Sequence, residues 1–125
     1  MTHPGLILFA HGARDPGWAA PFQAVAERVR AARPQALVRL AFLELMAPDI
    51  AAVADQLAVA GCQTIDIVPL FLGAGGHVRK DLPALLDGLR ARHAGIVFTL
   101  HPAVGEAPVV IEAMAQAASQ HLPIR

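Results

Sequence analysis

The stretch of sequence that decides the fold is residues 64–82, which read TIDIVPLFLGAGGHVRKDL. It begins as an apolar run typical of a buried strand and then breaks at a cluster of glycines. A helical pattern follows, and one face of it carries Leu82, Leu85, Leu86 and Leu89. His77 therefore lies where a strand gives way to a helix. Ligand sites in open parallel sheets form just beyond the carboxyl ends of the strands, and a histidine there can bind a metal ion or transfer a proton.

The glycines before His77 point the same way. The glycines of residues 73–76 let the backbone take positive φ and approach a ligand closely. A glycine cluster and one histidine are, by themselves, equally typical of a surface loop.

A second histidine follows a strand-like run near the amino terminus. Residues 5–10 are apolar and stop at His11, which is followed by glycines and a proline. Two histidines placed alike at two strand ends favour a shared site over a chance arrangement.

Strands and helices are expected to alternate along the whole chain. The predicted strands are residues 5–10, 37–42, 64–71 and 95–100, and the predicted helices are residues 18–33, 48–60, 81–92 and 108–121. Alternation implies right-handed crossovers and a parallel sheet, and strands that are apolar on both faces need helices on both sides. Residues 1–125 are therefore predicted to form one doubly wound α/β domain with a four-stranded parallel sheet. In the last helix, Val110, Met114 and Ala117 are expected to face the core.

Composition limits the function classes. Apolar residues make up 55% of the chain and charged residues 16%, against roughly 25% charged in average soluble domains. Ten basic and ten acidic residues cancel, which argues against a nucleic-acid or membrane-surface partner. Cys62 is the single cysteine, so an internal disulfide and a thiolate metal cluster are excluded and a reducing cytoplasm fits. We expect no secretory signal and no membrane span.

The carboxyl edge of the predicted sheet gathers polar residues. His11, Glu44, His77 and His101 each follow one strand. If the first and third strands are neighbours, as in the flavodoxin-like order, His11 and His77 can share one divalent first-row metal ion. Glu44 can join them as a ligand or accept protons beside them, or it can instead accept N–H bonds at a helix terminus. His101 is expected to be peripheral, and His3, His93 and His121 are expected at the surface.

Three cations flank the two histidine loops, namely Arg14, Arg79 and Lys80. They are either solvated surface charges or donors to an anionic ligand. The glycines before His77 lack the Gly-Lys-Ser/Thr ending of a nucleotide P-loop and the spacing of a dinucleotide fingerprint. Ala10 stands where histidine phosphatases place an arginine, and no serine has the context of a nucleophile elbow.

Three blocks of sequence carry a family resemblance. Residues 8–16 read LFAHGARDP, residues 41–48 read AFLELMAP, and residues 68–83 read VPLFLGAGGHVRKDLP. Together and in this order they resemble the CbiX/SirB group of class II chelatases, over nearly the whole chain. Ala13 departs from the pattern of this family, because relatives often carry serine after His-Gly. The chain matches the half-length form, with one copy of the domain where longer members have two.

The resemblance implies an activity and a partner. The implied reaction inserts a divalent metal into sirohydrochlorin, with cobalt, nickel or ferrous iron as substrate and with no nucleotide or redox cofactor. The residues that match the family's site are His11 and His77 for the metal and Glu44 as the assisting acid. Arg14, Arg79, Lys80 and the N–H groups near Gly75 and Gly76 are candidates to bind the tetrapyrrole's carboxylates. A non-catalytic metal or tetrapyrrole carrier would use the same ligands. A homodimer is also expected, with two half-length chains standing in for the two halves of longer relatives.

Overall fold

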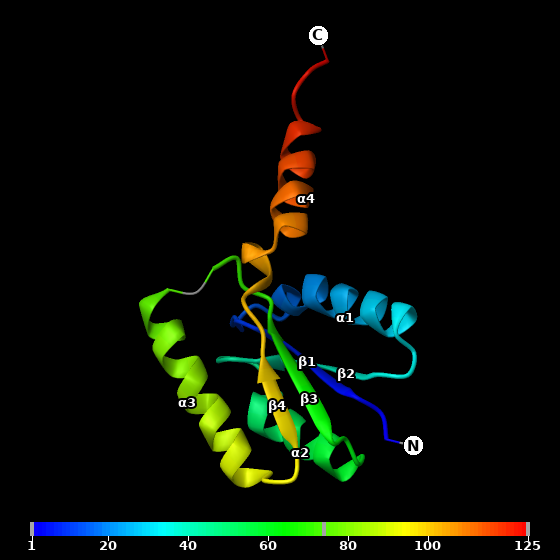
Figure 1. Cartoon of the computed structure of the whole chain (residues 1–125). Helices are drawn as coiled ribbons and strands as arrows, with labels where there is room; N and C mark the ends of the chain where they lie inside the picture. Colours follow the sequence, from blue (N-terminus) through cyan, green and yellow to red (C-terminus); the bar gives the residue numbers. More distant parts are fainter. Residues whose placement is uncertain (1, 74, 125) are drawn as a thin grey trace.

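The computed structural model describes residues 2–73 and 75–124, with the backbone but not the side chain of His77. Its centre is a parallel sheet with the strand order β2-β1-β3-β4 (Figure 1). The strands are β1 (Gly5–Ala10), β2 (Leu37–Phe42), β3 (Thr64–Pro69) and β4 (Val97–Leu100). The helices are η1 (Pro16–Ala19), α1 (Ala20–Ala32), α2 (Ile50–Val59), α3 (Gly76–Arg92), η2 (Val104–Glu106) and α4 (Pro108–Ser119). The predicted four-stranded parallel sheet and its flavodoxin-like order are confirmed.

Alternate residues of the central strand β1 enter separate cores on the two faces of the sheet. Ile7 and Phe9 belong to the larger core, together with buried residues of α2 and α3. Leu8 belongs to the opposite core, where it is grouped with Ala26 of α1. Helices therefore lie on both faces, as predicted, and β1 is apolar throughout because neither of its faces meets water.

Helix α2 begins and ends where the sequence predicts, since local signals mark both ends. The Asp49 carboxylate accepts the N–H of Ala52 at 2.9 Å and caps the first turn. Beyond the other end, Gly61 adopts a φ of 92°, a left-handed conformation that glycine takes without the penalty of a Cβ.

The start of α3 differs from the prediction. The helix begins at Gly76 rather than at Asp81, and Pro83 lies inside it. Gly75 is the N-cap and makes no side-chain capping hydrogen bond, so the sequence carries none of the usual start signals. His77 is consequently in the first turn of α3 and not on a loop before it. Gly75 has a φ of −69° and Gly76 is helical, so neither takes the positive φ that glycine allows.

The middle of α2 is joined to the carboxyl end of α3 through Asp55. Arg92 donates two hydrogen bonds to its carboxylate, at 2.8 and 2.7 Å, and a ring nitrogen of His93 lies 2.9 Å from it. The hydrogen bonds from Arg92 hold the pKa of Asp55 below its ordinary value. The surface position expected for His93 is wrong, because this side chain is only 15% exposed.

Helix α4 exists, but its predicted packing is wrong. It projects away from the sheet (Figure 1), and none of its residues is buried. Val110, Met114 and Ala117 form the expected stripe on the helix, yet the stripe meets no core in this chain. Across the described residues, no helix has both the length and the apolar character to cross a membrane.

Candidate functional site

His11 and Glu44 meet at the carboxyl edge of the sheet. His11 directly follows β1, and Glu44 comes two residues after β2. These strands pair in parallel register up to Ala10 and Phe42, and the N–H of Leu43 donates to the carbonyl of Ala10 at 2.8 Å. The sheet register therefore carries both side chains to the same place.

The two side chains are in direct contact. Nδ1 of His11 lies 3.1 Å from Oε1 of Glu44, and the two side chains are 43% and 42% exposed. With the proton on Nδ1, His11 donates to the carboxylate and its Nε2 keeps a free lone pair. A carboxylate that orients one ring nitrogen while the other faces a metal is a common arrangement around metal-binding histidines. Both groups are open enough for a substrate to reach.

Two aromatic residues that the sequence analysis did not single out hold His11. The Phe71 ring lies 4.4 Å from the imidazole, centroid to centroid, and Phe71 is buried just beyond β3. The indole N–H of Trp18 donates to the His11 carbonyl at 2.7 Å. Trp18 is the only tryptophan of the chain and follows His11 by seven positions. A lone tryptophan so close to a candidate metal ligand is the sequence signal that could have drawn attention to it.

The backbone at Gly12 and Leu45 shapes the contact further. A Cβ at position 12 would collide with the Glu44 carbonyl oxygen, so the two loops can approach this closely only with glycine there. Leu45 has a φ of 66°, and the N–H of Met46 donates to the Glu44 carbonyl at 2.8 Å. This is a tight three-residue turn of a rare and strained kind. Backbone strain at this loop is consistent with a functional role.

The alternative role of Glu44 at a helix terminus finds no support. Asp49 caps α2, and the hydrogen-bond contact of the Glu44 side chain is with His11. The geometry favours a carboxylate that positions His11 and can take up a proton beside it.

The backbone of His77 lies in the first turn of α3, shortly beyond the end of β3. β3 pairs directly with β1, so His77 follows the strand next to the one that ends at His11. Its side chain lies outside the described residues, and its predicted role as a metal ligand remains a prediction. Among the side chains described, no three His, Cys, Asp or Glu residues are grouped to hold a metal ion. The described part of the site is the His11–Glu44 pair.

The predicted anion-binding groups surround this edge. Arg14 is exposed in the loop after His11, and Arg79 and Lys80 are exposed in the first turns of α3. Gly75 and Gly76 are exposed, with open space where a Cβ would be. Because no side chain caps α3, its first N–H groups are available to an anionic ligand.

His101 is not part of this arrangement. Its Nε2 lies 2.8 Å from Oδ1 of Asp66, and it lines a groove with the first residues of β1 and the end of α1. The expectation that it is peripheral fits this position.

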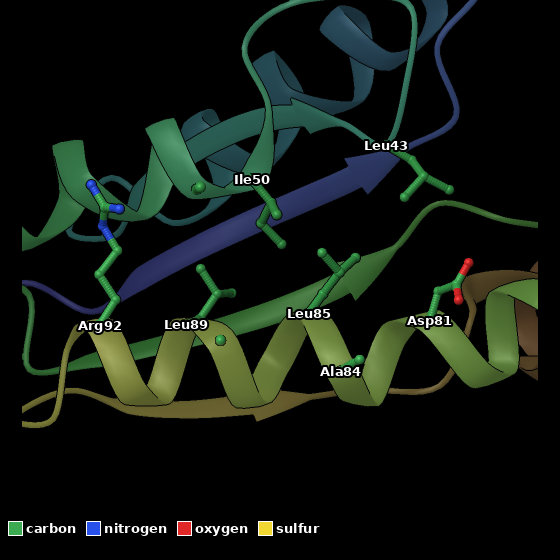
Figure 2. Close-up of a pocket in the computed structure, with 9 residues that line it drawn as sticks. Leu43, Ile50, Asp81, Ala84, Leu85, Leu89 and Arg92 are labelled. Carbon is green, nitrogen blue, oxygen red and sulfur yellow. The ribbon is translucent and has the colours of Figure 1, made fainter.

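A separate apolar groove of about 580 Å³ lies between α2 and α3. Figure 2 shows leucine and isoleucine side chains pointing into it, with Asp81 and Arg92 at its two ends. It contains none of the predicted site residues, although Leu43 at one end is next in sequence to Glu44. The groove lacks convergent polar groups, so the chemistry of the molecule is concentrated at the His11–Glu44 edge.

Comparison with known proteins identifies relatives along most of the chain. The CbiX family model matches residues 5–121. The sirohydrochlorin cobaltochelatase of Sulfolobus acidocaldarius is 35% identical over 79 residues, which cover 63% of this chain and 63% of that protein. The matched region is less than two thirds of the length of this relative and of two from Methanococcus.

Solved structures agree with this assignment. The cobalamin biosynthesis CbiX protein of Marinobacter aquaeolei VT8 is 32% identical, with a TM-score of 0.83 and coverage of 94% of this chain and 95% of that one. The sirohydrochlorin chelatase SirB of Bacillus subtilis, solved with cobalt, has a TM-score of 0.83 and 22% identity, and this chain matches 51% of its length. The latter likeness concerns the fold alone. With its family match, its sheet order and its site edge together, this chain belongs to the CbiX family.

Proposed function

We propose that this protein is a metal chelatase that inserts a divalent metal ion, with cobalt as the first candidate, into sirohydrochlorin. The observation that carries the proposal is the His11–Glu44 contact at the carboxyl edge of the sheet. It offers one imidazole nitrogen to a metal ion and a carboxylate to the protons that metal insertion releases. The relatives support the choice of reaction, since archaeal members are sirohydrochlorin cobaltochelatases. SirB structures contain cobalt or Fe³⁺, which supports iron as the alternative to cobalt. Nickel is a further alternative because histidine and carboxylate ligands also suit it.

The proposed reaction divides the work between the site residues. His11 and His77 receive the metal ion as it sheds water, and open coordination positions let it pass to the macrocycle. Two pyrrole protons must leave, and Glu44 or a neutral histidine accepts them as a general base. The peripheral carboxylates of the tetrapyrrole bind Arg14, Arg79, Lys80 and the N–H groups at Gly75 and Gly76. This chemistry needs no nucleotide and no redox cofactor.

The direct test is turnover. The purified protein is mixed with excess sirohydrochlorin and with Co²⁺, Ni²⁺ or Fe²⁺ in turn, and the absorbance change of the macrocycle is followed. Many metallated products per chain support the chelatase, and the fastest metal identifies the preferred substrate. Binding that stops at one equivalent without product would show a carrier instead.

The Glu44→Gln variant tests the carboxylate. Glutamine can still accept the hydrogen bond from His11, but it has no charge and cannot take up a proton. We expect the turnover rate to fall about 10- to 100-fold, as for other groups that orient metal-bound histidines. The melting temperature should hardly change, because exposed ion pairs contribute at most about 1 kcal/mol.

The matched control is Asp49→Ala, in the same loop. It removes the cap of α2 and should lower stability by about 1 kcal/mol while sparing the rate. If Glu44→Gln behaved like Asp49→Ala, with a lower melting temperature and full activity, Glu44 would be a structural residue only.

We also propose that residues 1–125 act as one chelatase domain and work as a homodimer in the cytoplasm. This chain matches about half of SirB, so two copies supply what that protein holds in one chain. Four strands at about 4.8 Å spacing give a sheet edge roughly 15 Å wide, comparable to the width of a tetrapyrrole. A second copy would cover the sides of the macrocycle that one sheet edge leaves open. The balanced charge supports neither a nucleic-acid nor a membrane partner, and one buried free cysteine fits a reducing compartment.

Light scattering during gel filtration tests the dimer. We expect twice the chain mass at micromolar concentration, because an unusually apolar chain with an uncovered helix has surface to bury. A monomer mass with full chelatase activity would show that the dimer is not required.

A further inference from the structure

Two exposed leucines lie at the carboxyl edge of the sheet, one on each side of His11. Leu45 is 62% exposed and Leu72 is 72% exposed. Leu45 follows β2 and Leu72 follows β3, and both strands pair with β1, which ends just before His11. Single exposed leucines are ordinary on a protein surface. These two, however, come directly after Glu44 and Phe71, the two residues whose side chains contact the His11 ring.

Leu45 is exposed although the apolar residues around it are packed. Leu43 packs against the larger core, and Met46 packs against a separate cluster that contains Phe42. Leu45 also has a φ of 66°, in the left-handed region that a bulky side chain rarely occupies and that glycine or asparagine takes at less cost. Leucine therefore costs stability here through backbone strain and gains no contact within the chain. Strain of this kind points to a role in function.

Leu72 is exposed on a backbone that is held in place. Phe71, the residue before it, is buried in the larger core, and the Phe71 carbonyl accepts the N–H of Gly105 at 2.9 Å. A Cβ on Gly105 would collide with the backbone of Leu72, so the two segments are in close contact. An apolar side chain on a held backbone loses little conformational freedom when a ligand meets it, which favours binding.

The spacing of the two leucines suits a flat macrocycle. Because β1 lies between β2 and β3, the ends of these two strands are about 10 Å apart. A tetrapyrrole such as sirohydrochlorin carries its carboxylates around the rim, whereas the two faces of the ring are flat and apolar. The cations proposed to bind the carboxylates, Arg14, Arg79 and Lys80, leave these faces without a contact. Exposed apolar side chains on both sides of His11 match the face of the ring.

We propose that Leu45 and Leu72 together contact one face of the tetrapyrrole and hold the ring over the metal ligand His11. This inference rests on the proposed function and adds to it a contact for the apolar part of the substrate. Binding buries leucine surface that is exposed in the free protein, which favours the complex. The ring face is present before and during metal insertion, so the contact should strengthen substrate binding and affect KM rather than kcat.

Substitution of each leucine by asparagine and by methionine tests the contact. Asparagine is polar and tolerates the left-handed backbone at position 45, so the melting temperature of Leu45→Asn should not fall. Leu45→Asn and Leu72→Asn should each raise KM for sirohydrochlorin about 5- to 10-fold, and the double variant about 25- to 100-fold. In all three, kcat should stay within about threefold. Leu45→Met and Leu72→Met keep an apolar side chain and should stay within about twofold of the parent KM.

The matched control is Val59→Asn. Val59 is 90% exposed and is the last residue of α2, which leads into the start of β3 at the opposite edge of the sheet. This change makes the same kind of substitution on another exposed apolar residue, and it should leave KM unchanged. Titration with Co²⁺ alone checks the metal site, and the metal affinity of every leucine variant should equal that of the parent, because His11 and Glu44 are untouched.

Titration with metal-free sirohydrochlorin measures binding without turnover. Trp18 is the only tryptophan and donates to the His11 carbonyl, so its fluorescence should report the arrival of the ring. The Kd of the asparagine variants should rise by the same factors as KM. Salt screens charge contacts far more than apolar ones. In 1 M salt the effect of Leu45→Asn should therefore persist, while the effect of Arg14→Ala should shrink.

Parent-like KM and Kd in the asparagine variants overturn the inference, and so does an effect that disappears in 1 M salt. If Leu45→Asn or Leu72→Asn turned a dimeric parent into a monomer, the leucines would belong to the contact between copies, and the inference would also be wrong. These results leave the proposed function standing, since the parent still inserts the metal. A parent protein that neither binds nor metallates sirohydrochlorin would refute the proposed function, and this contact with it.

Discussion

The His11→Ala and His77→Ala variants are each expected to lose at least about 100-fold in the turnover of metal insertion, equivalent to about 2.7 kcal/mol of transition-state stabilisation. Alanine has no nitrogen to bind the incoming metal. His11→Ala also removes the donor that meets Glu44, so the carboxylate loses its fixed position.

Both variants should fold. His11 is 43% exposed, so its truncation opens no sealed cavity, and alanine is a good residue for the first turn of α3 where His77 stands. The melting temperature should stay within a few degrees of the parent value, because exposed positions contribute little to stability. The measurements are turnover with Co²⁺ and sirohydrochlorin, metal binding by titration, and thermal unfolding.

The control for these variants is His3→Ala. His3 bonds to the Gln35 carbonyl at 2.7 Å, away from the proposed site, and its loss should leave turnover unchanged. In the parent protein, activity should fall on the acid side, because a protonated imidazole cannot bind a metal ion. Near-normal turnover in either site variant would contradict a metal site shared by these two histidines.

The Gly12→Ala variant is expected to damage both the fold and the site. Its new methyl group would collide with the Glu44 carbonyl oxygen and lie 3.1 Å from Cγ of Met46. Neither loop can retreat freely, because the Trp18 indole holds the His11 carbonyl and the Leu43 N–H holds the Ala10 carbonyl. Such overpacking typically costs 1–3 kcal/mol, which corresponds to a melting temperature lower by about 4–12 °C in a chain of this size.

Activity should fall further than stability alone explains, since separating the loops pulls His11 and Glu44 apart. The matched control is Gly88→Ala in α3, where a Cβ meets open space. That change should raise stability by roughly 0.5–1 kcal/mol, because alanine is the better helix residue. A Gly12→Ala protein with the parent melting temperature and turnover would show that the two loops are not held together as described.

Local sequence determined the framework of this protein. Short sequence patterns predict the strands β1 and β2, the cap of α2 at Asp49 and its end at Gly61. They can do so because the backbone conformations that these residues favour are local properties. Once four strands alternate with helices, parallel topology places their carboxyl ends at one edge. The neighbourhood of His11 and Glu44 follows from that rule, and so does the position of His77 beyond the adjacent strand.

Other features depended on contacts between residues far apart in the chain. The contacts of His11 with Glu44 and Phe71 arise from sheet register and packing, which no short pattern records. His93 is only 15% exposed, and its partner Asp55 lies in another helix. No capping side chain marks the start of α3 at Gly76, so the usual sequence signal of a helix start is missing there. The amphipathic stripe of α4 correctly predicts a helix, but the expected packing of this stripe against the core is wrong, because a stripe does not say which surface it meets. The close approach of Gly105 to the Leu72 backbone, just before α4, is likewise a contact that no short pattern records.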